Sequence, residues 1–74
     1  MARTKYKADV HTRKGGYSDG QKIIQASSGV EAFDALYDQG YIASSMWYVD
    51  NGSWVWLGSQ FCSDRLLTKT QNAF

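Results

Sequence analysis

The residues that could carry acid–base or nucleophilic chemistry are few and far apart in the chain. There is one histidine, His11, and one cysteine, Cys62. A catalytic site needs two or three such groups within hydrogen-bond reach of one another. The carboxylates Glu31, Asp34 and Asp38 recur at helical spacing and fit a solvated helix face, and no metal-ligand spacing occurs. We therefore expect no catalytic residue, no metal and no cofactor, and a protein that is not an enzyme.

Tryptophan side chains are the better candidates for function, because a turn signal predicts on which face of the sheet they lie. Asn51-Gly52 lies between two aromatic-rich runs, 41–50 and 53–61. A two-residue Asn-Gly loop tolerates positive φ at both positions, so a hairpin is predicted in which Trp47 opposes Trp56 and Val49 opposes Trp54. The register places one set of side chains toward the helix: Ile42, Ser44, Met46, Tyr48, Val55, Leu57, Ser59 and Phe61. It places the other set on the opposite face: Ala43, Ser45, Trp47, Val49, Trp54, Trp56, Gly58 and Gln60.

The face that carries all three tryptophans is predicted to bind a partner. One helix covers only one face of a four-stranded sheet, and tryptophan dominates the energetics of many protein interfaces. Two alternatives remain open. The faces could be reversed, with the tryptophans packed against Phe33 and Leu36. The end of the chain could also fold back and lay Leu66, Leu67 and Phe74 over the rings.

Basic side chains form the second part of the predicted partner-binding set. Lysine and arginine concentrate in residues 1–22, whereas residues 23–64 contain neither. Lys5, Lys7, Arg13 and Lys14 could neutralise phosphates, and together with the aromatic rings they resemble a platform for single strands. The net charge of only +1 is unusual for a dedicated nucleic-acid binder. A small nucleic-acid-binding module is therefore the alternative function.

The elements that position these residues follow from periodicity. Strict alternation over residues 5–13 predicts a half-buried strand with Tyr6, Ala8 and Val10 on one face. Residues 14–20 are rich in glycine and predict a mobile loop, and residues 21–27 predict a second strand whose inward residues, Ile23 or Ile24 with Ala26, stay undecided.

A helix is predicted to begin after Ser28, because Ser28 and Glu31 have the spacing of a capping box. Gly40 is placed to end it in a left-handed conformation. The stripe that should face the sheet consists of Val30, Phe33, Leu36 and Tyr37.

These elements predict an α+β fold, a four-stranded antiparallel sheet in the order β-β-α-β-β with one helix packed on one face. Residues 1–74 form a single domain, and residues 62–74 lack a clear period and are expected to be a C-terminal tail. A core this small is marginal. A single cysteine cannot form an intramolecular disulfide, so self-association as a homodimer is one candidate source of further burial.

Location is predicted from what the chain lacks. It has no apolar run of the length that a membrane-spanning helix needs. Its basic first residues precede no apolar stretch, so no signal peptide is expected. We expect a cytoplasmic protein without membrane contact.

One resemblance covers residues 23–57. The stretch IIQASSGVEAFDALYDQGY, followed by WYVDNGSWVWL, resembles small phage-encoded host-interaction proteins, including some anti-CRISPR inhibitors. In those proteins a strand ending in Ala-Ser leads into a short helix and then a hairpin. The resemblance implies a protein of the host cytoplasm that binds and inhibits a host protein or ribonucleoprotein assembly. It supplies no catalytic residues, and the charge balance departs from that of acidic DNA mimics.

Overall fold

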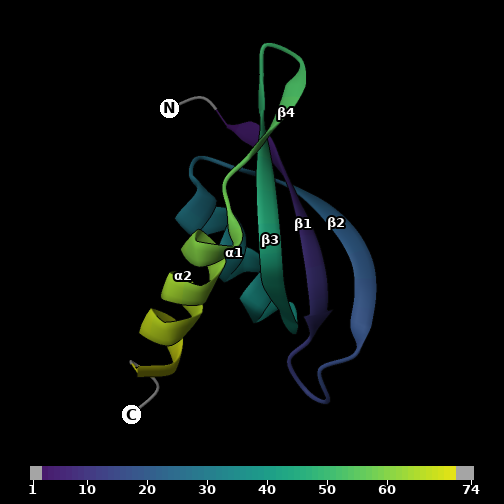
Figure 1. Ribbon diagram of the computed structural model, residues 1–74, viewed down its shortest axis with the longest axis vertical. Helices are drawn as coiled ribbons and strands as arrows, with labels where there is room; N and C mark the ends of the chain where they lie inside the picture. Colours follow the sequence, from purple (N-terminus) through teal and green to yellow (C-terminus); the bar gives the residue numbers. More distant parts are fainter. Residues whose placement is uncertain (1–2, 72–74) are drawn as a thin grey trace.

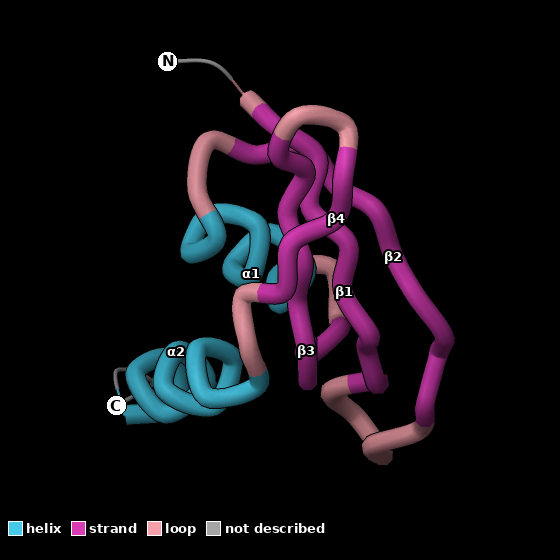
Figure 2. The backbone as a smooth tube through the Cα atoms, turned by 45° about the horizontal axis from the view of Figure 1, so that its top comes forward, coloured by secondary structure: helices cyan, strands magenta, loops and turns pink. Residues whose placement is uncertain are grey.

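The computed structural model describes residues 3–71, which form one sheet and two helices (Figure 1). The elements are β1 (Thr4–Thr12), β2 (Ser18–Ala26), α1 (Gly29–Asp38), β3 (Tyr41–Asp50), β4 (Ser53–Trp56) and α2 (Ser59–Gln71). The strands form an antiparallel sheet in the order β2-β1-β3-β4. Both helices lie on the same side of it, as Figures 1 and 2 show. The predicted α+β class and four-stranded antiparallel sheet are confirmed.

The core lies between the sheet and the helices. The alternation in β1 buries Tyr6, Ala8 and Val10, as predicted. Phe33 from α1 and Met46 from β3 are both 0% exposed and belong to this cluster of buried residues. No helix within residues 3–71 has the length and apolar character needed to cross a membrane.

The β3–β4 hairpin has the predicted turn and register. Asn51 and Gly52 have φ angles of 52° and 80°, so both adopt the left-handed conformation that this turn requires. Trp47 pairs with Trp56, and Val49 pairs with Trp54. The turn chemistry therefore determined the alignment of the two strands.

The predicted face assignment is wrong for the first part of β3. Asp9 pairs with Ser45, but Val10 pairs with Ala43, so Ser44 is an extra residue in β3. This β-bulge reverses the alternation: Ala43 is buried in the core at 2% exposed, while Ser44 is exposed. The Ser44 hydroxyl donates to the Asp9 carbonyl across the bulge (3.2 Å).

The second strand also differs in its bounds. β2 begins at Ser18, within residues 14–20, which were predicted to be a loop. The connection from β1 is therefore residues 13–17. Gly20, with a φ of 74°, lies where β2 gains one residue over β1. The register is now decided: Ala26 is 1% exposed and Ile24 packs on the core, whereas Ile23 is 63% exposed on the other face.

The end of the chain corrects two predictions, because residues 59–71 form α2 rather than a strand end and a tail. β4 stops at Trp56, and Gly58, with a φ of 103°, turns the chain. The inward positions of α2 recur at helical spacing and are Phe61, Cys62, Arg65, Leu66 and Lys69. Two of the five are charged, so the apolar pattern alone did not reveal the helix. The part of the predicted tail beyond residue 71 lies outside the described residues.

The predicted ends of α1 are confirmed. The Ser28 hydroxyl accepts from the Glu31 backbone N–H at 3.1 Å, and Gly40 follows the last turn with a φ of 100°. The Glu31 carboxylate, however, accepts from the Ser27 hydroxyl and from Arg3 instead of closing a capping box on Ser28. Val30 is 41% exposed and does not belong to the buried stripe.

Asp34 joins the two helices and is not part of a solvated face, contrary to prediction. Its carboxylate accepts from Nε and Nη2 of Arg65 at 2.9 and 2.6 Å, and Lys69 Nζ lies 3.9 Å away. The hydrogen bonds from Arg65 lower the pKa of Asp34 below its usual range. This bidentate pair fixes α2 against α1.

Asp34→Asn should therefore destabilise the fold by about 1–2 kcal/mol at neutral pH, because the charge-assisted bonds become neutral ones. A carboxyl whose pKa is lowered on folding stabilises the fold above its unfolded pKa of roughly 4, and that contribution is lost as pH falls through the folded value. The difference between wild type and variant should thus be constant near neutrality and shrink in acid. Urea unfolding across pH measures it, with Asp38→Asn, an exposed carboxylate on the same helix, as control. An equal effect of the two variants would contradict the assignment.

Candidate functional site

The sheet has one face that neither helix covers. Residues paired between neighbouring strands project on the same side, so the register identifies a row across all four strands. Ile23 pairs with Lys7, Lys7 with Trp47, and Trp47 with Trp56. One side chain from each strand thus contributes to a continuous strip across the open face.

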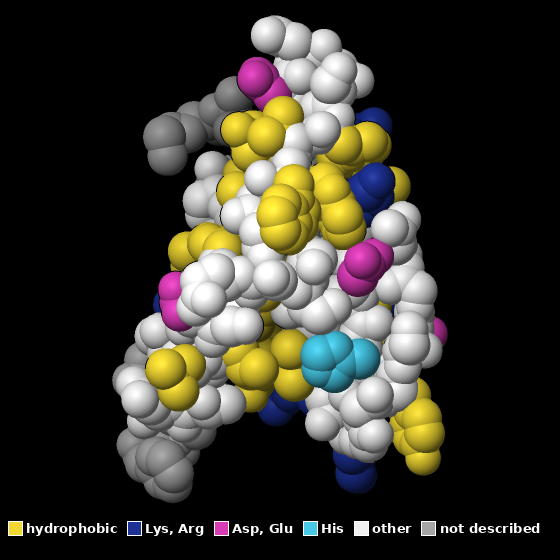
Figure 3. All heavy atoms as spheres, in the orientation of Figure 1, with side chains coloured by type: hydrophobic (Ala, Val, Ile, Leu, Met, Phe, Trp, Pro, Cys, Tyr) yellow, Lys and Arg dark blue, Asp and Glu magenta, His cyan; other side chains and the backbone are white. Residues whose placement is uncertain are grey.

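The tryptophans lie on this face, as the register predicted. Trp56 is 59% exposed and Trp54 39% exposed, while Trp47 and Val49 are half-buried beside them. Figure 3 shows hydrophobic side chains gathered where β3 and β4 meet on this side of the molecule. The alternative with reversed faces is wrong.

The C-terminal segment does not cover the rings in the part that the structure describes. Leu66 packs against the core, and Leu67 is 56% exposed on α2. Phe74, the third residue of that alternative, lies outside the described residues.

Lys7 is held between two of the rings. Its Nζ lies 5.0 Å from the centroid of the Trp47 ring and 4.8 Å from that of Trp54. Such cation–π contacts favour one arrangement of long side chains over the others they could adopt. The open-sheet surface, as we name it, consists of Lys5, Lys7, Ile23, Trp47, Val49, Trp54 and Trp56, and the two contacts of Lys7 lie at its centre.

The surface becomes polar toward the other end of the sheet. The Asp9 carboxylate accepts from Gln21 Nε2 at 2.8 Å, and His11 lies between Ser18 and Ile42 in the register. The apolar part of the open face is therefore bounded along the strands by hydrogen-bonding groups.

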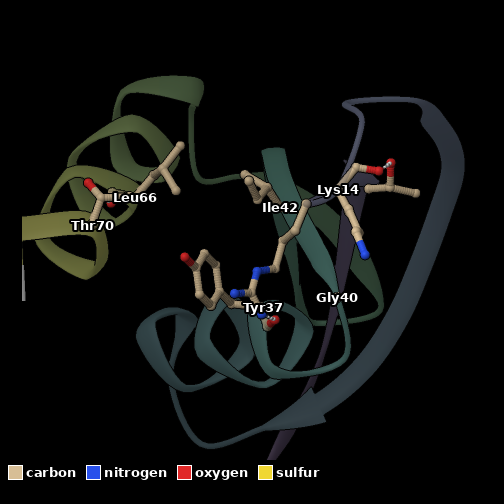
Figure 4. A pocket seen from close by; sticks show the side chains of 8 residues that line it. Lys14, Tyr37, Gly40, Ile42, Leu66 and Thr70 are labelled. Carbon is tan, nitrogen blue, oxygen red and sulfur yellow. Dashed lines mark hydrogen bonds between the residues drawn. The ribbon is translucent and has the colours of Figure 1, made fainter. Parts of the chain in front are cut away.

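Arg13 and Lys14 do not join Lys5 and Lys7, so the predicted basic set is divided between two places. Arg13 and Lys14 follow β1 at its far end and line a pocket between the sheet and the helices (Figure 4). The prediction grouped the four residues by charge. In the structure Lys5 and Lys7 lie within β1, whereas Arg13 and Lys14 lie beyond its last residue, Thr12. Tyr37, Leu66 and Thr70, which also line the pocket, were not predicted as site residues because α2 was not expected.

Metal-ligating side chains do not cluster within residues 3–71. No three His, Cys, Asp or Glu side chains in that range come together to hold a metal ion. Cys62 is 2% exposed, and burial raises the pKa of its thiol to about 11. The thiol therefore stays protonated near neutral pH and is a poor nucleophile.

Comparisons with protein-family models, with curated proteins and with solved structures found no match.

Proposed function

We propose that this protein is a non-enzymatic binding module whose open-sheet surface docks onto another protein. Following the resemblance of residues 23–57, the partner is a host protein or ribonucleoprotein assembly, and the docked domain inhibits it, as anti-CRISPR proteins do. The setting is then the cytoplasm of the host cell.

The observation that carries the proposal is the exposure of large apolar side chains on one uncovered face. Ile23, Trp54 and Trp56 are 63%, 39% and 59% exposed. Ile23 and Trp56 end the strip across the four strands, and Trp54 lies beside it, paired with Val49. Contiguous exposed apolar groups on a small domain usually mark an interaction site, and tryptophan is enriched among the residues that dominate binding.

Charge indicates what the partner offers. Lys5 and Lys7 are the cations of the open-sheet surface, and the nearest carboxylate along β1, Asp9, is already bonded to Gln21. A complementary partner has an apolar depression for the indoles and carboxylates at its rim. Inhibition follows if that depression is a working surface of the partner.

Nucleic acid is the second candidate, favoured by the presence of exposed indoles beside lysines on a sheet. Bases stack on such rings, and lysines pair with phosphates. Against it, Arg13 and Lys14 lie at the other end of the sheet, so two lysines remain on the surface and few phosphates could be neutralised.

Charge reversal at Lys5 tests the proposal. Tagged wild type, Lys5→Glu and Lys14→Glu are used to capture proteins from a nuclease-treated bacterial lysate, and each enriched protein is purified and titrated directly. Lys14 is the matched control, because it is an exposed cation just beyond the other end of β1. We expect to find a direct partner to which Lys14→Glu binds like wild type. Lys5→Glu should bind the same partner roughly fivefold more weakly, because its rim ion pair is lost and the charge is reversed.

Other outcomes would reject the proposal. Binding of labelled single strands that falls steeply with salt and is lost with Lys5→Glu would replace it with the nucleic-acid function. Sedimentation showing a stable homodimer that buries the tryptophans would assign the surface to self-association. A partner that binds all three variants equally would use another surface.

A further inference from the structure

A pocket of about 790 Å³ opens at the end of the molecule away from the hairpin turn. It exists because β4 pairs with β3 only at residues 47–50, so α2 instead runs beside the other half of β3. Figure 4 shows Leu66 and Thr70 on α2 across a gap from Tyr37 and Ile42. The volume falls in the range of sites for small organic molecules.

The pocket wall is mainly apolar, and its charged groups are of one sign. Tyr37, Ile42 and Leu66 supply a ring and two aliphatic side chains. Arg13 and Lys14 are the only charged residues of the described lining, and no carboxylate is among them.

Arg13 is held in place with most of its donors free. Its guanidinium lies 4.1 Å from the centroid of the Tyr37 ring, and Nη1 donates to the Tyr37 carbonyl at 3.0 Å. A guanidinium has five N–H groups. Within residues 3–71 that carbonyl is the one hydrogen-bond acceptor its side chain has, so its other N–H groups can bind an anion.

A purely structural role accounts for only part of this arrangement. The last turn of α1 has no basic residue, and Arg13 bonds to a carbonyl there, as cations near helix C-termini do. That role needs one N–H group and no pocket. The position of the remaining donors beside an apolar cavity is what points to a ligand.

We infer that this pocket binds a small amphiphilic anion, with its apolar body against Tyr37, Ile42 and Leu66 and its carboxylate, sulfonate or phosphate on the Arg13 guanidinium. The guanidinium fork can pair with two oxygens of a planar carboxylate or of a tetrahedral sulfonate or phosphate. The site is separate from the open-sheet surface and does not depend on the function proposed for it.

Two dyes of similar shape test the inference. Anilinonaphthalene sulfonate carries the anion, and phenylnaphthylamine is its uncharged counterpart. Both are titrated into the full chain by fluorescence, and backbone amide NMR shifts locate the binding. We expect saturable shifts at Gly40, Ile42 and Leu66, and binding of the anionic dye roughly fivefold or more tighter than that of the neutral dye.

Variants separate the site from general charge and from the tryptophans. Arg13→Gln should remove the preference for the anionic dye while the neutral dye binds as before. Lys5→Gln is the matched control, because it also removes one positive charge but lies on β1 away from the pocket, so it should change neither titration. Ile42→Trp should fill the cavity and weaken both dyes. Equal binding of the two dyes, an equal effect of the two charge variants, or shifts confined to Trp54 and Trp56 would each overturn the inference.

Discussion

Phe33→Ala is expected to leave most of the chains unfolded at room temperature. Phe33 is 0% exposed, and its ring stacks on Tyr37 with centroids 6.5 Å apart. Truncation of a buried phenylalanine costs about 3–5 kcal/mol, and the core of a domain this small supplies no more than roughly the same amount. The cavity therefore removes about as much free energy as the fold has.

Urea unfolding, followed by tryptophan fluorescence and by circular dichroism, measures this loss. Val30→Ala is the control: it truncates an apolar residue of the same helix that is 41% exposed, so little stability should change. A Phe33→Ala variant that keeps a cooperative transition within about 1 kcal/mol of wild type would mean that the core can close around the missing ring.

Local patterns predicted the parts of the fold that depend on neighbouring residues. The Asn51-Gly52 turn fixed the pairing of Trp47 with Trp56 because both turn residues have positive φ. The Ser28 cap fixed where α1 starts. In each case the physical cause lies within a few residues, so the sequence contains all of it.

The errors arose where the cause lies elsewhere in the fold. Nothing next to Ser44 indicates a bulge, because the extra residue is defined only against β1, to which its hydroxyl bonds. Asp34 is on the solvated side of an isolated helix and becomes a partner only when Arg65 arrives on α2. Arg65 and Lys69 face inward on α2 although they are charged. A search for an apolar stripe therefore did not find the inward side of this helix.

The candidate site was predicted in the same uneven way. The hairpin register placed the three tryptophans together, and the structure leaves their face uncovered. Ile23 was missed because residues 21–27 were too short to decide which side chains point inward. The pocket was missed entirely, since it needs the shortness of β4 and the presence of α2.

Trp56→Ala is expected to separate binding from folding. Trp56 is 59% exposed and pairs with Trp47 at the edge of the sheet. Its truncation should therefore lower the free energy of unfolding by well under the roughly 3–5 kcal/mol of a core aromatic. The same change should weaken binding to the protein partner by at least about 2 kcal/mol, roughly thirtyfold, as loss of a central interface tryptophan does.

The control for this change is Tyr17→Ala, which removes an aromatic ring that is 74% exposed in the β1–β2 connection, away from the open-sheet surface. It should bind the partner like wild type, so a loss seen only with Trp56→Ala reflects the site and not a general decrease in exposed apolar area. Urea midpoints and calorimetric titrations of both variants and wild type give the two free energies side by side. If Trp56→Ala unfolds as Phe33→Ala does, the indole supports the core and its exposure has another cause. If the variant folds and binds with unchanged affinity, the partner contacts a surface other than the tryptophans.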